Sequence, residues 1–104
     1  MSNMNELMRQ AARVQRRIQQ IHEEMKQKQW TAKVAGDKVA ATVTGERKIS
    51  SIEVDPEFWK GEERDMVLDS IAAAINAAQE MAEKEIETAV SQATGGLSIP
   101  GLTR

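Results

Sequence analysis

The sequence lacks cysteine, which excludes disulfide bonds and thiolate metal sites. It has no tyrosine and only three aromatic residues, so a core must be built from aliphatic side chains and alanine. No apolar run approaches the roughly 20 residues that span a bilayer, and the N-terminal segment shows no signal-peptide pattern. We therefore expect a cytoplasmic protein without a membrane partner.

Convergent catalytic or metal-binding residues are also missing from the sequence. His22 is the single histidine, and the adjacent pairs Glu23-Glu24 and Glu62-Glu63 diverge around a helix instead of meeting at a substrate. The glycine-containing C-terminal segment has no lysine of the kind that a phosphate-binding loop needs. We expect no enzymatic activity, no metal, no cofactor and no small-molecule substrate.

The composition that remains is that of one folded unit with uneven charge. The 104 residues fit a single domain over residues 1–104, with 40% hydrophobic and 29% charged residues. Residues 1–50 carry ten basic and five acidic residues, whereas residues 51–104 carry four and eleven, within a net charge of −2. This split indicates either an anionic partner for the basic half or attraction between the two halves.

The first segment has the periodicity of a helix. Asn3 and Glu6 have the spacing of a capping box, and the apolar positions that follow recur at alternating steps of three and four residues. We predict a helix over residues 3–28 with one apolar seam. The seam consists of Met4, Leu7, Ala11, Val14, Ile18, Ile21 and Met25.

A region of period two follows and predicts an antiparallel sheet. It is rich in valine, threonine and isoleucine, and turn signals at Gly36-Asp37 and Gly45-Glu46 divide it. We expect three strands, at about 30–35, 38–44 and 48–54. The fold class is α+β, because a three-stranded sheet needs helices to cover its apolar face.

A second long helix is predicted at about 62–94. Asp55 and Pro56 favour a short helical turn before it, and glycines at 95 and 96 favour its end. The segment 95–104 carries three apolar residues that need a docking surface: Leu97, Ile99 and Leu102.

The helix lengths favour a homodimer. At 1.5 Å per residue the two helices measure about 39 and 50 Å, whereas a compact chain of this size is roughly 33 Å across. We predict a tweezer-like dimer with projecting helical arms; the alternative is a monomer with both helices folded over one sheet face. The predicted interface residues are Ile71, Ala74, Ile75 and Ala78.

The arginines of the first helix share an arc opposite its apolar seam, at 100° per residue. Such a face either keeps the helix soluble or contacts phosphates. Trp30 and Trp59 fit core edges better than base stacking. The candidate phosphate-contact residues are Arg9, Arg13, Arg16, Arg17, Lys26 and Lys28.

The order of these elements resembles the YbaB/EbfC family of bacterial nucleoid-associated proteins. The resemblance is carried by "IEVDPEF", "IAAAINAA" and "TGGLSIPGL" within nearly the whole chain. It implies a dimeric, tweezer-shaped α+β protein that binds DNA. With it, the arginine face is predicted to bind double-stranded DNA in the nucleoid, mainly through phosphates and with little sequence preference. A dimeric adaptor or small chaperone, using the helical arms and the apolar tail, is the alternative.

Overall fold

The computed structural model describes residues 2–95, and their elements have the expected α+β order. The three strands form an antiparallel sheet in the order β1-β2-β3, and a short helix then turns the chain into the second long helix. The elements are α1 (Ser2–Lys26), β1 (Gln29–Val34), β2 (Val39–Thr44), β3 (Ile49–Val54), α2 (Pro56–Gly61) and α3 (Arg64–Ala93).

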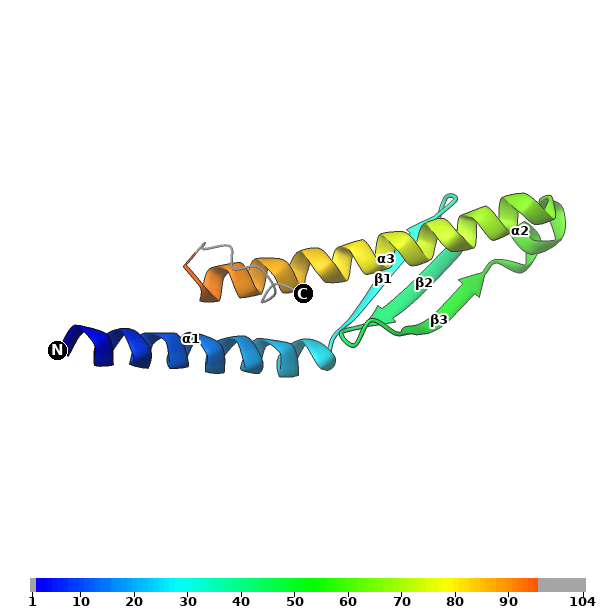
Figure 1. The fold of residues 1–104 in the computed structure, drawn as a ribbon. Coiled ribbons are helices and arrows are strands. Elements are labelled where there is room, and N and C mark those ends of the chain that lie inside the picture. The colour runs from blue at the N-terminus through cyan, green and yellow to red at the C-terminus, as the bar shows by residue number, and fades with distance from the viewer. Residues whose placement is uncertain (1, 96–104) are drawn as a thin grey trace.

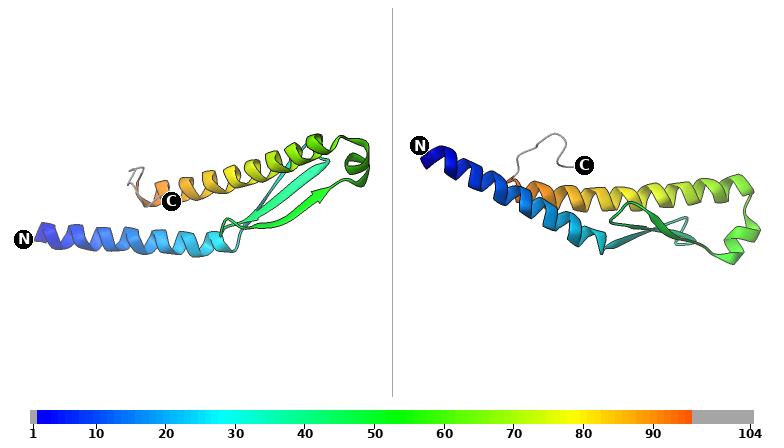
Figure 2. Two further views of the ribbon diagram at one scale, coloured as in Figure 1. Left: turned by 45° about the vertical axis from the view of Figure 1, so that its right-hand side comes forward. Right: turned by 60° about the horizontal axis from the view of Figure 1, so that its bottom comes forward.

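The chain is elongated, with principal extents of 71 × 21 × 17 Å. Helix α3 crosses one face of the sheet, and its C-terminal half runs beside α1, which projects beyond the sheet as an arm (Figures 1 and 2). The radius of gyration is 19.1 Å, against about 13 Å for a compact chain of this length. Within residues 2–95, α3 makes the main helix contacts with the sheet and only the C-terminal end of α1 reaches it. This arrangement differs from the alternative in which both helices fold over one sheet face.

Helix α1 ends at Lys26, two residues before the expected boundary at 28, because the residues that follow form a tighter turn than an α-helix. The amides of Gln27 and Lys28 donate to carbonyls three residues back, at 3.2 and 3.0 Å. Gly45, in the turn between β2 and β3, lies directly against this helix end. A Cβ on Gly45 would stand 1.6 Å from the carbonyl oxygen of Met25, so only glycine allows the approach.

The hydrophobic core is divided along α3. One cluster joins the C-terminal half of α1 to the C-terminal half of α3 and to β1; Ile18, Ile86 and Val90 belong to it. The other lies between α3 and the middle of the sheet, where Val39 and Ala74 are fully buried. Alanines on α3 let the helix backbone approach the sheet closely, so the two clusters together fix α3 but leave the outer part of α1 uncovered.

Most of strand β3 is left uncovered by the other elements of residues 2–95. Its residues Ile49 and Ile52 pair with Val43 and Ala41 of β2, so they share the sheet face on which α3 lies. Helix α3 packs mainly on β1 and β2, however, and leaves Ile49 46% and Ile52 44% exposed. We call these two residues the β3 surface.

The connection from β3 to α3 is fixed by a cap. The Asp55 side chain accepts hydrogen bonds from the amides of Glu57 and Phe58, at 2.8 and 3.4 Å, and Pro56 follows at the first helical position. The Glu57 amide is the main cause of the lowered pKa of Asp55. Helix α3 begins at Arg64 and not at 62, because Glu62 has an extended backbone.

Candidate nucleic-acid interface

Helix α1 has two different faces. The C-terminal part of its apolar seam is buried against α3 and the sheet, with Ile18 at 5% and Ile21 at 2% exposure. The arginines lie on the opposite side and are all exposed to solvent. Because α1 projects as an arm, no other described element covers this face (Figure 1). The arginine face consists of Arg9, Arg13, Arg16 and Arg17.

The four arginines differ in how far their charge is compensated. Arg9 lies 3.6 Å from Glu6, and Arg17 lies 3.4 Å from Glu24, in solvent-exposed ion pairs. Arg13 and Arg16 form no ion pair with any residue between 2 and 95. Exposed ion pairs of this kind are worth little and exchange readily. The positive potential of the arm is therefore least compensated at Arg13 and Arg16.

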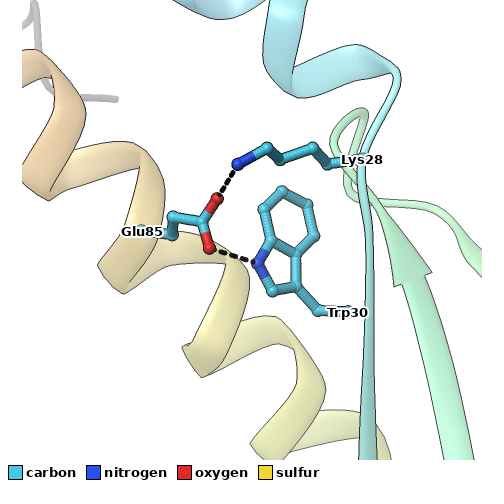
Figure 3. A network of polar contacts seen from close by, with 3 residues as sticks. All are labelled: Lys28, Trp30 and Glu85. Carbon is cyan, nitrogen blue, oxygen red and sulfur yellow. Dashed lines mark hydrogen bonds and ion pairs between the residues drawn. The ribbon is translucent and has the colours of Figure 1, made fainter.

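The two candidate lysines lie in different surroundings. Lys26 forms an exposed ion pair with Glu23 at 3.2 Å, one helical turn back. Lys28 follows the end of α1, and its ammonium donates to Glu85 of α3 at 2.5 Å (Figure 3). The structure thus directs Lys28 toward the acidic helix and away from the arginine face.

Glu85 accepts a second hydrogen bond, from the indole nitrogen of Trp30 at 3.2 Å (Figure 3). The hydrogen bond from Lys28 and then that from Trp30 lower the pKa of the Glu85 carboxyl, since both favour its charged form. Trp30 is only 7% exposed and belongs to the core, so it offers no surface to a base. The sequence gives no sign of this network, because Glu85 lies 57 residues after Lys28.

The remaining sequence candidates lie away from the arginine face or are not grouped for chemistry. Trp59 is 58% exposed, at the far corner of the molecule on α2, and His22 is half-buried on α1. Within residues 2–95, histidine and carboxylate side chains form no group of three that could hold a metal ion. None of the described helices combines the length and hydropathy needed to cross a bilayer.

Helix α3 carries an exposed acidic face, as its spacing predicts. One of these carboxylates, Glu83, binds Arg47 of the β2–β3 turn at 2.7 Å. DNA would be repelled from this side of α3, whereas the arginine face of the arm would attract it. The acidic face consists of Asp65, Asp69, Glu80, Glu83 and Glu87.

The predicted interface residues lie at the contact between α3 and its own sheet. Ala74 and Ala78 are fully buried there, and Ile71 and Ile75 are half-buried. The alanines thus have no free surface for a second copy, whereas the β3 surface has one. The apolar tail residues Leu97, Ile99 and Leu102 lie outside the described residues.

Comparison with known proteins shows which family the chain is similar to. The YbaB/EbfC DNA-binding family matches residues 1–97. A nucleoid-associated protein of Clostridium acetobutylicum is 39% identical over 100 residues, which cover 96% of this chain and 89% of that protein. Nucleoid-associated proteins of Thermoanaerobacter sp. and Rickettsia akari are 36% and 31% identical, again over 96% of this chain and over 90% and 94% of theirs.

Proposed function

The chain belongs to the YbaB/EbfC DNA-binding family, and we propose that it is a nucleoid-associated protein that binds double-stranded DNA through the arginine face of α1. The observation that carries this proposal is the exposure of four arginines on one side of a projecting helix whose other side is apolar. The relatives named above are nucleoid-associated proteins, which supports the same location for this chain, in the cytoplasm and at the nucleoid.

Phosphate groups are the DNA feature that this face fits. From Arg9 to Arg17 the rise along the helix axis is about 12 Å, enough to meet two adjacent phosphates. Guanidinium groups carry a permanent charge and donate forked hydrogen bonds to phosphate oxygens. Residues 2–95 contain no helix-turn-helix that would present a recognition helix, and contacts to phosphates alone give little sequence preference.

The active form in this proposal is a homodimer that joins through the β3 surface. Ile49 and Ile52 lie on the face that α3 covers elsewhere in the sheet, and contact with a second copy would remove their exposed apolar surface from water. Two copies would bring eight arginines, and hence up to about eight phosphate contacts, to one DNA molecule.

The test is DNA binding by the variant Arg13→Gln/Arg16→Gln, measured with a random duplex over a range of salt concentrations. These two arginines have the least compensated charge, so we expect weaker binding and a salt slope reduced by about 3 to 4 for the dimer, at roughly 0.9 per phosphate lost. Lys33→Gln/Lys60→Gln removes the same charge from exposed positions outside α1 and serves as the matched control. Equal losses in both variants, or none in either, would refute the arginine face as the DNA site and favour an adaptor function.

A further inference from the structure

The apolar seam of α1 continues beyond its partner helix. It is buried at Ile18, half-buried at Val14 and exposed at Ala11, and its outermost large residues, Leu7 and Met4, are 61% and 65% exposed. Helix α3 ends at Ala93, which packs on the same cluster as Val14. About three turns of α1 therefore present an apolar face that α3 is too short to cover.

Helix α3 ends beside the middle of α1. The two helices run antiparallel side by side, so the uncovered N-terminal part of α1 lies ahead of the C-terminal end of α3 (Figures 1 and 2). Gly95 has a φ of +68°, the left-handed conformation that closes a helix and releases the chain from it. The nine residues that follow, 96–104, include Leu97, Ile99 and Leu102.

We infer that residues 96–104 dock on the exposed seam of α1 in their own chain and complete the apolar contact of the arm. Nine residues reach up to about 30 Å, whereas the seam from Ala11 to Met4 is only about 10 Å long. The spacing also fits, because positions i and i+2 of an extended segment lie about 6.6 Å apart on one side and helix positions i and i+4 about 6 Å apart. Leu97 thus meets the small Ala11, Ile99 meets Leu7, and Leu102 lies beyond the Pro100-Gly101 turn at Met4.

Covalent attachment favours the chain's own seam over that of another molecule. A short tether holds the segment beside this face at an effective concentration in the millimolar range, well above that of a second molecule in dilute solution. The docking needs neither DNA nor a dimer, so the inference does not depend on the proposed function.

Disulfide trapping tests the inference directly, because the protein has no cysteine of its own. We expect Leu7→Cys/Ile99→Cys to oxidise within one chain at least about tenfold faster than the control pair Asn5→Cys/Ile99→Cys. Asn5 lies two residues from Leu7 but on the opposite side of α1, so it has the same tether length and the wrong face. A non-reducing gel separates the cross-linked monomer from a covalent dimer. Equal rates for the two pairs, or a product that joins two chains, would overturn the inference.

Amide hydrogen exchange provides a second measurement, on variants that change residues 97–103 and leave the seam of α1 unaltered. In Leu97→Ser/Ile99→Ser/Leu102→Ser, we expect the helical amides of residues 7–12 to exchange about tenfold faster or more, because the outer turns lose their apolar cover. Thr103→Ser changes a residue of the same segment without removing an apolar side chain and should leave exchange unaltered. Identical exchange in both variants would mean that the segment does not cover the seam.

Discussion

Glu85 is the residue at which the basic N-terminal half and the acidic C-terminal half of the chain meet. It receives hydrogen bonds from Lys28 and Trp30 at the point where α1 passes into β1. Arg47 and Glu83 form a second ion pair between the halves. Lys38 and Asp55 form a third, at 3.7 Å. The uneven charge of the sequence thus serves attraction between the halves at these three pairs, whereas Arg13 and Arg16 remain available to an external anion.

This residue predicts a pH dependence of stability. Because the pKa of Glu85 is lowered below its ordinary value of 4.5 on folding, its contribution is complete above pH 4.5 and is lost as the pH falls through the folded pKa. Glu85→Gln should therefore cost stability at neutral pH, by no more than about 1 kcal/mol at this partly exposed site, and the difference from wild type should shrink in acid.

Urea unfolding followed by Trp30 fluorescence in a Trp59→Phe background measures this effect. Glu87→Gln removes an exposed carboxylate from the same helix and is the control for general charge effects. A deficit of Glu85→Gln that stayed constant from neutral to acidic pH would contradict the ionic role of Glu85.

Among the elements, the end of α1 is positioned by backbone contact with the β2–β3 turn, so Gly45 determines how the arm leaves the sheet. Gly45→Ala would place a Cβ 1.6 Å from the Met25 carbonyl oxygen, and the backbone would have to move. We expect a loss of about 2 kcal/mol or more in the free energy of unfolding, as for overpacked sites.

The matched control for this change is Gly61→Ala. Gly61 is the last residue of α2 and has no atom within 4 Å of an added Cβ, so alanine there should be neutral or slightly stabilising. Chemical denaturation of both variants compares them directly. If both variants had the same free energy of unfolding, the contact between the β2–β3 turn and the end of α1 would accommodate the added methyl group without loss of stability.

The sequence predicts those elements whose periodicity is local. The seam from Met4 to Met25 predicts α1, and the alternation around Val39 predicts the sheet, because burial on one face leaves a regular pattern in the sequence. The arginine face is predicted on the same basis, since 100° per residue places it opposite the seam. The ion pair between Lys28 and Glu85 cannot be predicted in this way, because residues that lie 57 positions apart leave no periodic signal in the sequence.

Tertiary packing also determines which surface the small residues of α3 contact, a question that sequence periodicity does not answer. Ala74 and Ala78 have the small side chains that suit contact between helices of two copies, but the same property suits contact with β2, and their burial is complete within one chain. Conversely, the alternation of Ile52 and Val54 predicts an inward face without showing that α3 stops short of Ile52. Ile49, three residues before Ile52, reaches the same face only through the register shift opposite Thr42 and Val43, which the alternation does not predict. Which helix covers which strand depends on the crossing of α3 over the sheet.

At the scale of the whole molecule, the long arm and the uncovered β3 both favour assembly of two copies. If β3 joins the copies, a charge placed on its inner side should separate them while leaving each fold intact, because Ile52 is 44% exposed in the single chain. We expect Ile52→Lys to weaken dimerisation by about 100-fold or more, since two symmetry-related isoleucines lose their burial and two charges must be desolvated. Ser51→Lys adds the same side chain to the opposite face of β3 and should leave the dimer unchanged.

Sedimentation velocity measures this change, and DNA binding of the same two variants links it to function. A separated chain carries four of the eight arginines, so the slope of log affinity against log salt should fall to about half for Ile52→Lys and stay constant for Ser51→Lys. Halving of the slope requires that both arms contact one DNA molecule in the dimer. If Ile52→Lys became monomeric and kept the full slope, the arms would act independently, and dimerisation would serve a purpose other than joint phosphate contact.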